Sequence, residues 1–168
     1  MSIDIGAMTA ADAHDVLAIY AEGLATGEAT FETEVPTWAA WDAGHLQDCR
    51  LIARAEGTLV GWTALSPVSD RCVYGGVAEV SVYVAAAARG QGVGGKLLHH
   101  LVAASEEAGL WTLQASLFPE NAASLRLHER CGFLVVGRRE RIGQLNGVWR
   151  DTLLLERRSS TVGTTAGP

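Results

Sequence analysis

Residues Ala88–Leu98 read ARGQGVGGKLL, and this glycine-rich segment joins two stretches with different periodicities. Before it, Val77–Val84 places its last three valines on one face and mostly polar side chains on the other, which is typical of a β-strand. After it, apolar residues recur at helical spacing over Val93–Val102, and Gly109 supplies a helix end. The segment therefore predicts a strand, a glycine loop and an amphipathic helix in direct succession.

Two nucleotide-binding patterns overlap in this loop, and both are incomplete. The dinucleotide fingerprint G-x-G-x-x-G begins at Gly90, but it requires an acidic residue about 20 positions further on, at the end of the next strand. That strand is expected to end at residues 117–119, which read Leu-Phe-Pro. The P-loop pattern ends at Lys96, but Leu97 stands where a Ser or Thr must bind Mg²⁺.

A third pattern, R-x-x-G-x-G, fits the loop from Arg89 to Gly94. Glycines expose backbone N–H groups, the helix N-terminus adds a partial positive charge, and the arginine adds a full one. These features indicate a binding site for an anion such as a phosphate. The alternative is a glycine-rich turn that only permits close packing.

The remaining periodicity predicts one α/β domain over residues 1–156, a length suited to a single hydrophobic core. The expected strands are 2–7, 51–55, 58–65, 111–117, 133–136 and 148–155, and further helices are expected after Thr9, after Pro36 and over 121–130. Residues 157–168 offer nothing to bury, so we expect a loose C-terminal tail.

Composition excludes several classes of function. A formal net charge of −6 argues against nucleic acid as the main partner, because phosphate backbones require a basic face. Cys49, Cys72 and Cys131 are odd in number and widely spaced, which favours free thiols in a reducing compartment. No apolar run is long enough for a membrane span, no signal peptide is evident, and no histidine pair has zinc-site spacing. We expect a cytoplasmic protein without metal.

A second motif lies downstream, at Glu120–Phe133, where the chain reads ENAASLRLHERCGF. With both motifs in this order, the chain resembles the GNAT-type N-acetyltransferases over about residues 2–156. More narrowly, the segments GEATFETEVPTWAAW, AEVSVYV and LHERCGF resemble the phosphinothricin and methionine sulfone or sulfoximine acetyltransferases. The resemblance implies a GNAT fold, in which a mostly antiparallel mixed sheet is flanked by helices. It also implies an enzyme that transfers acetyl from acetyl-CoA to the primary amine of a small amino-acid-like acceptor.

The same resemblance implies how acetyl-CoA is bound. The glycine loop would hold its pyrophosphate, the second motif would support its pantetheine arm, and a splayed strand would offer backbone groups to the thioester. The implied cofactor-binding residues are Val82, Tyr83, Val84, Arg89, Gly90, Gln91, Gly92, Val93, Gly94, Gly95, Lys96, Asn121 and Ser124.

Acetyl transfer to an amine needs a base for the amine proton, stabilisation of the oxyanion and protonation of the leaving thiolate. Glu79, which matches the family's catalytic glutamate, is the candidate base, and His128 is the candidate general acid. The alternatives are a solvated carboxylate at a strand end and a histidine that only packs under the cofactor. No cysteine has the context of a nucleophile, so we expect direct attack within a ternary complex.

For the acceptor, the resemblance points to Arg71, Tyr74 and Phe31, and an arginine could pair with an amino-acid carboxylate. Residues 144–145 read Gln-Leu where related sequences often carry a basic-aromatic pair, which leaves the acceptor open. Other candidates are a protein N-terminus, a polyamine and an aminoglycoside, and a strongly acidic pocket would favour a polycation. A non-catalytic acetyl-CoA-binding domain is a further alternative. The family's tendency to dimerise suggests a homodimer.

Overall fold

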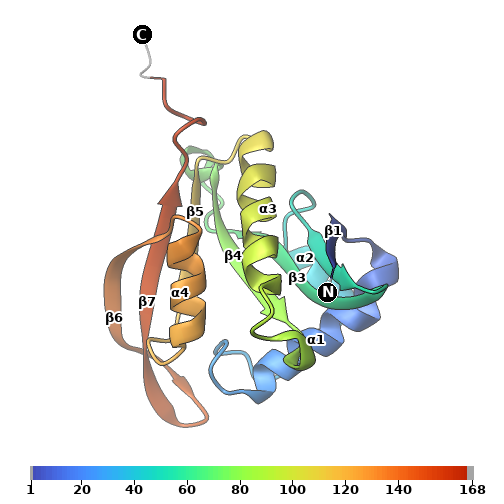
Figure 1. Ribbon diagram of the computed structural model, residues 1–168. Helices are drawn as coiled ribbons and strands as arrows, with labels where there is room; N and C mark the ends of the chain where they lie inside the picture. The colour runs from blue at the N-terminus through green and yellow to red at the C-terminus, as the bar shows by residue number, and fades with distance from the viewer. Residues whose placement is uncertain (1, 166–168) are drawn as a thin grey trace.

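The computed structural model describes residues 2–165, which form one mixed sheet with helices on both faces (Figure 1). The seven strands in this part of the chain lie in the order β1-β2-β3-β4-β5-β7-β6, and only β4 and β5 pair in parallel. The strands are β1 Ile3–Ala7, β2 Leu51–Ala55, β3 Thr58–Pro67, β4 Val77–Val84, β5 Thr112–Leu117, β6 Leu134–Leu145 and β7 Val148–Arg158. The α-helices are α1 Ala13–Ala25, α2 Trp38–Gly44, α3 Val93–Glu107 and α4 Ala122–Arg130. This architecture is the predicted α/β fold.

Helices cover the two faces of the sheet separately. On β3, Leu65 packs against the apolar side chains of α3. Trp62 and Ala64 of the same strand pack instead against α1 and α2. Successive side chains of a strand point to opposite faces, so α3 lies on one face and α1 and α2 on the other. Figure 1 shows α3 and α4 side by side on the face toward the viewer.

Strands β4 and β5 separate partway along their length. Their pairing begins at Val77 with Thr112 and ends at Glu79 with Gln114, although both strands continue beyond it. Strand β5 stays paired with β7 from Thr112 to Leu117, and β4 stays paired with β3 up to Val84. The sheet therefore opens in a V beside residues 80–84 of β4, as the family resemblance implied.

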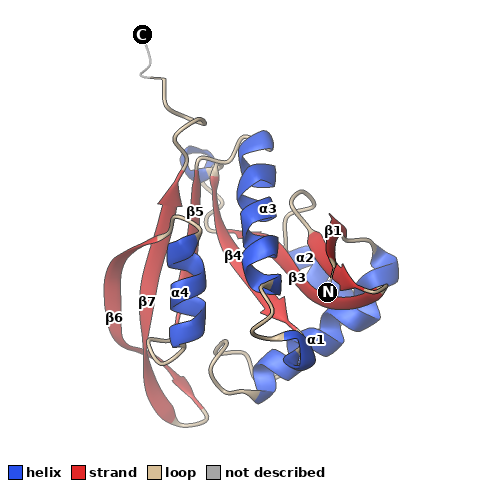
Figure 2. Ribbon diagram, viewed as in Figure 1, coloured by secondary structure: helices blue, strands red, loops and turns tan. Residues whose placement is uncertain are grey.

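The C-terminal hairpin is longer than its sequence indicates. We expected a strand over 133–136, but β6 continues to Leu145 and pairs with β7 around an Asn146-Gly147 turn (Figure 2). Both turn residues have positive φ, 50° and 80°, which suits the tight turn of a twisted hairpin. Most of β6 is exposed, so its residues lack the alternation that marks a half-buried strand.

The expected loose tail from residue 157 also differs from the structure. Arg157 and Arg158 continue β7, and the following Ser159 is buried, donating a hydrogen bond from Oγ to Oε2 of Glu106 at 3.1 Å. Arg158 donates to the carbonyl oxygen of Gly163 at 2.6 Å and so orders the segment after the strand. Long-range polar contacts, which local periodicity does not reveal, hold this segment; residues 166–168 lie outside the described range.

Candidate active site

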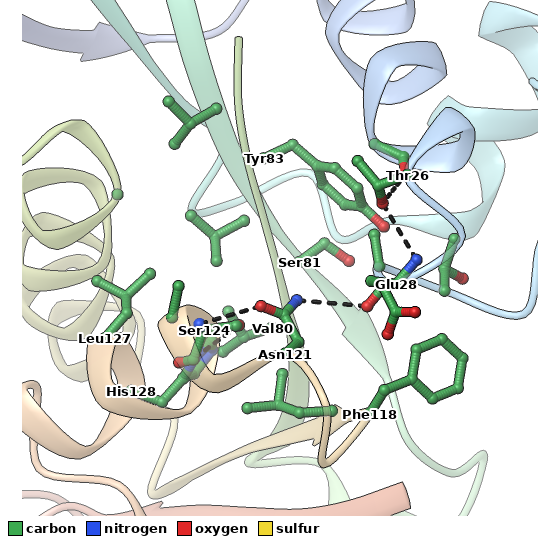
Figure 3. Close-up of a pocket in the computed structure, with 18 of the residues that line it drawn as sticks. Thr26, Glu28, Val80, Ser81, Tyr83, Phe118, Asn121, Ser124, Leu127 and His128 are labelled. Carbon is green, nitrogen blue, oxygen red and sulfur yellow. Dashed lines mark hydrogen bonds between the residues drawn. The ribbon is translucent and has the colours of Figure 1, made fainter. Parts of the chain in front are cut away.

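A cleft of about 700 Å³ occupies the opening between β4 and β5 (Figure 3). Its walls come from β4, the glycine loop, α4, the end of β5 and the loop between α1 and α2. Fourteen of the predicted site residues line it: Phe31, Glu79, Val82, Tyr83, Val84, Arg89, Gly90, Gly92, Val93, Gly94, Gly95, Asn121, Ser124 and His128. The fold thus brings most of the predicted site into one cavity.

The glycines of the loop serve two physical purposes. Gly90 and Gly92 have φ values of 77° and 83°, the left-handed region that glycine adopts without strain, and α3 begins directly afterwards at Val93. A Cβ at Gly94 would instead lie 3.0 Å from the side chain of Leu127 on α4. The loop therefore exposes a helix N-terminus toward the cleft and also permits close approach of α3 and α4.

Glu79 is half-buried at the point where β4 and β5 separate. Its Oε1 accepts hydrogen bonds from Nε2 of Gln114 at 3.4 Å and from Oγ of Ser116 at 3.3 Å, both on β5. None of the ion pairs formed within residues 2–165 includes this carboxylate. Neutral donors thus orient Glu79, with no paired cation that would stabilise its negative charge and weaken it as a base.

His128 on α4 is 2% exposed, and its Nδ1 lies 2.7 Å from the carbonyl oxygen of Ser124. Because a carbonyl oxygen only accepts, Nδ1 carries the proton, and Nε2 of the neutral ring has a free lone pair. Burial lowers the pKa of His128, and the bond to Ser124 opposes this effect only in part. A neutral imidazole in this tautomer can accept a proton at Nε2 but has none to donate there.

The loop between α1 and α2 closes one side of the cleft and is held by contacts from distant parts of the chain. On β7, Arg150 donates to Oε2 of Glu28 at 2.8 Å and to the carbonyl oxygen of Gly27 at 3.1 Å. It also contacts Oε2 of Glu120 at 3.3 Å, and its guanidinium lies 4.1 Å from the ring centroid of Phe118. Arg150 therefore joins β7, this loop and the segment before α4.

Asn121 connects the same loop to α4. Its Oδ1 accepts from the backbone N–H of Ser124 at 3.2 Å, which caps the helix, and its Nδ2 donates to the carbonyl oxygen of Glu28 at 3.3 Å. Figure 3 shows Asn121 between these two partners. Beside it, Phe31 packs edge-to-face on Phe118 with ring centroids 5.0 Å apart. Sequence reasoning found Asn121 and Phe31 but missed Glu28 and Arg150, which no local motif marks.

Four predicted site residues lie outside the lining of this cleft. Lys96 donates from Nζ to the carbonyl oxygen of Ile3 at 2.6 Å, and Gln91 donates to the backbone of its own loop. Arg71 and Tyr74 are exposed, with the guanidinium 5.5 Å from the centre of the tyrosine ring. Within one chain, neither Arg71 nor Tyr74 reaches the cavity that contains Glu79.

The lining of the cleft has an uneven distribution of charge. Glu28, Glu32 and Glu79 contribute carboxylates, and among the described lining residues only Arg89, beside the glycine loop, is a permanent cation. The phosphate-binding end is therefore positive. The end beside the α1–α2 loop is negative through Glu32, because Arg150 pairs with Glu28. A cationic amine is favoured at the negative end.

A sheet opened at a carboxylate, next to a glycine-rich helix N-terminus, suits acetyl transfer from a phosphate-bearing donor, and the similar proteins show the class to be the acetyl-CoA-dependent N-acetyltransferases. The chain belongs to the acetyltransferase (GNAT) family, whose model matches residues 14–133. The resemblance drawn from the two motifs is thereby confirmed.

The similar proteins narrow the family further. The chain is 37% identical over 157 residues to the phosphinothricin N-acetyltransferase of Alcaligenes faecalis, with coverage of 89% of this chain and 79% of the relative. It is 30% identical over 162 residues to the L-methionine sulfoximine/L-methionine sulfone acetyltransferase of Pseudomonas paraeruginosa, covering 93% and 94%. This chain is therefore related to the phosphinothricin and methionine sulfoximine acetyltransferases over nearly its full length.

A solved relative extends the likeness to three dimensions. The crystal structure of a GNAT superfamily phosphinothricin acetyltransferase from Sinorhizobium meliloti in complex with acetyl-CoA superimposes with a TM-score of 0.88 at 27% identity. The match covers 100% of this chain and 94% of that one. Separately, none of the helices within residues 2–165 has the length and apolar character needed to cross a membrane.

Proposed function

We propose that the protein acetylates the primary amine of a small amino-acid-like acceptor by direct attack on acetyl-CoA bound in the cleft. The observation that carries the proposal is the position of Glu79, at the apex of the opening between β4 and β5 and in the same cavity as the glycine loop. Phosphinothricin and methionine sulfoximine or sulfone are the first acceptors to test, because related proteins are named for them.

In the proposed mechanism, acetyl-CoA supplies an activated acyl group as its thioester. Arg89 and the N–H groups at the start of α3 bind its phosphates, since both present positive charge. The backbone of Val82–Val84 has no strand partner on its β5 side and is free to bind the thioester arm. Asn121 and Ser124 would support the same arm from α4.

Glu79 removes the proton of the acceptor amine, directly or through water, so that the nitrogen lone pair can attack the carbonyl carbon. The C–N bond forms, the C–S bond breaks, and CoA leaves as a thiolate that takes a proton from solvent. A well-placed base contributes roughly 10²–10⁴ in rate. Burial lowers the pKa of His128 and Ser124 orients its ring, so we assign it the role of shaping the cavity and accepting a hydrogen bond at Nε2. This differs from the expectation of a general acid, which needs a proton to donate.

Thiol release from acetyl-CoA, measured over a panel of amines, tests the proposal. The panel contains phosphinothricin, methionine sulfone, methionine sulfoximine, a polyamine, an aminoglycoside and a peptide with a free N-terminus. Release with the amino acids but not with the polyamine, the aminoglycoside or the peptide supports a small amino-acid-like acceptor. Binding of acetyl-CoA without release for any amine would identify a non-catalytic binding domain instead.

We further propose a homodimer in the cytoplasm. The β6–β7 hairpin exposes several apolar side chains at the edge of the sheet, and covering them would favour association. The exposed apolar residues of this hairpin are Leu134, Val135, Val136, Ile142, Val148 and Trp149. All three cysteines are free thiols, as a reducing compartment requires. Light scattering on the purified protein measures the oligomeric state directly.

A further inference from the structure

A bulge in the C-terminal hairpin brings β6 against the loop that closes the acceptor end of the cleft. Strand β6 leaves its register with β7 after Arg139 and resumes it at Gly143. Residues 140–142 of β6 therefore lie opposite the single residue Asp151 of β7. A bulge of this kind bends its strand and changes the direction in which the following residues point. The bulge thus determines where Gly143 meets the rest of the molecule.

Gly143 lies directly against Phe31 of the α1–α2 loop. A Cβ at Gly143 would lie 3.2 Å from both Cε1 and Cζ of the Phe31 ring. Ordinary contacts between carbon atoms are roughly 3.5–4.0 Å, so the ring occupies space that any other residue at this position would need. The φ of Gly143 is not positive, so its backbone conformation does not require glycine. The absence of a side chain at position 143 therefore makes room for the ring.

Phe118, which follows β5, bounds the ring of Phe31 on another side. The two rings meet edge-to-face with their centroids 5.0 Å apart, and both residues line the cleft, where Figure 3 labels Phe118. Phe118 is 3% exposed, and the guanidinium of Arg150 lies 4.1 Å from its ring centroid. Arg150 is also the register partner of Gly143 on β7. The Phe31 ring is therefore held by a fixed neighbour and by β6 while it forms part of the cleft wall.

We propose that Gly143 determines how large an acceptor side chain the cleft admits, because it lets the ring of Phe31 lie back from the cleft. Gly143 is not part of the cleft lining, so it is a positioning residue that acts through Phe31. The inference rests on the proposed acetyltransferase function and specifies the size of the acceptor's side chain.

A side chain at position 143 would move the Phe31 ring toward the cleft. The new Cβ takes space that the ring now fills, and Phe118 is buried beneath Arg150 and cannot yield. The ring can then shift only toward the open cavity, which loses volume at the acceptor end. Acceptors with longer side chains should lose most, because one methylene in an apolar pocket changes kcat/KM by roughly 10- to 200-fold.

Two acceptors that differ by one methylene test the proposal. Methionine sulfone and S-methylcysteine sulfone carry the same α-amine, carboxylate and sulfone, and the second has the shorter side chain. The ratio of their kcat/KM values should fall roughly 3-fold in Gly143→Ala and roughly 10-fold or more in Gly143→Val, mainly through the KM of the longer acceptor. The KM for acetyl-CoA should stay within about twofold of wild type, because the glycine loop lies elsewhere in the cleft.

Gly137→Val is the matched control. Gly137 lies on the same strand, also resumes the register with β7 after a shift, and has no positive φ. A Cβ there would have no heavy atom within 4 Å apart from its chain neighbours. This variant should leave the ratio unchanged, although it adds the same side chain to β6. Circular dichroism and light scattering verify that both valine variants keep the fold and the oligomeric state of the wild type.

A double-mutant cycle tests whether Gly143 acts through Phe31. In a Phe31→Ala background no ring remains to be displaced, so adding Gly143→Val should change the ratio by less than about twofold. The full effect of Gly143→Val in that background would overturn the proposal. A ratio that Gly143→Val leaves unchanged, or that Gly137→Val lowers equally, would also overturn it.

Failure of the proposed function gives a different result, namely no thiol release from acetyl-CoA with any amine in the wild type. The displacement of the ring can be measured without turnover. A crystal structure of Gly143→Val should show the Phe31 ring shifted into the cleft relative to wild type, and an unmoved ring would contradict the proposal.

Discussion

The phosphate-binding end of the cleft is built from one short segment, whereas the acceptor end is assembled from parts of the chain that are far apart. At the first end, residues 89–95 supply the arginine, the left-handed glycines and the helix N-terminus together. At the second end, Arg150 of β7 holds Glu28 of the α1–α2 loop beside Glu120 of the segment before α4. Backbone conformation determines the first end, and long-range side-chain contacts determine the second.

This difference has a consequence for specificity. A loop that binds through its backbone N–H groups accepts any phosphate of suitable size and depends little on the surrounding side chains. An assembled end can change its acceptor through a few substitutions on loops while the fold and the cofactor site stay the same. Substitutions at the two ends should therefore affect different kinetic constants.

Between the two ends lies Glu79, where we expect the largest effect. Glu79→Gln keeps the shape of the side chain and removes the base, so kcat should fall on the order of 10²-fold or more while acetyl-CoA affinity stays near wild type. Raising the pH should partly rescue the variant, because solution then supplies free amine. Steady-state kinetics across pH and direct binding of acetyl-CoA check both points. Near-normal turnover at pH 7, with chemistry rate-limiting, would show that Glu79 is not the base.

At the phosphate-binding end, Arg89→Ala should weaken acetyl-CoA binding by about 1.5–3 kcal/mol, or roughly 10- to 150-fold, through loss of a charge-assisted contact. The acceptor KM at saturating acetyl-CoA should change little. Calorimetric titration of acetyl-CoA and acceptor kinetics measure the two effects. A collapse of turnover with unchanged binding would contradict the assigned role and remove the contrast between the two ends.

At the acceptor end, Arg150→Met should raise the acceptor KM by roughly 10-fold. The substitution removes the contacts that hold the α1–α2 loop beside the cleft, so the loop no longer positions the acceptor. Arg138→Met is the matched control, since Arg138 lies in the same hairpin and pairs with Asp151 at the surface, 2.5 Å away. Acetyl-CoA affinity should stay within about twofold of wild type in both variants. Equal effects of both variants on the acceptor KM would mean that the hairpin as a whole determines acceptor binding, and not the contacts of Arg150 with the α1–α2 loop.

The smallest effect concerns pH and stability. The folded pKa of His128 lies below its unfolded value, so its contribution to stability is fully present above about pH 6.5 and is lost as the pH falls below that value, where the unfolded chain binds the proton first. The loss is at most about 1.4 kcal/mol per pH unit for one histidine. Urea unfolding at pH 7.5 and 5.5 should show a smaller pH dependence for His128→Gln than for wild type. Burial also lowers the pKa of His45, and this histidine is present in both the wild type and the His128→Gln variant.

Much of the cofactor side could be read from the sequence because its signals are local. The apolar stripe of α3 and the alternation of β4 predicted both elements, and the buried Leu97, Leu98 and Leu101 match the stripe. Only the start of strand β6 could be placed in this way, because the exposed remainder of the strand shows no alternation. Strand β6 pairs with β7 through the turn at Asn146 and Gly147, where both residues have positive φ.

The sequence by itself determined the order of elements and the anion-binding loop, because these depend on backbone conformation and on spacing along one strand or helix. Its resemblance to a known family added Glu79 and His128 as candidates. Only the tertiary structure decided that Arg71 lies outside the cleft and that Arg150 holds the α1–α2 loop through Glu28 and Gly27. Each of these facts requires residues far apart in the chain to meet in space. These long-range contacts depend on how the sheet opens after Glu79 and on which loops fold over the opening. No local pattern of side chains predicts them.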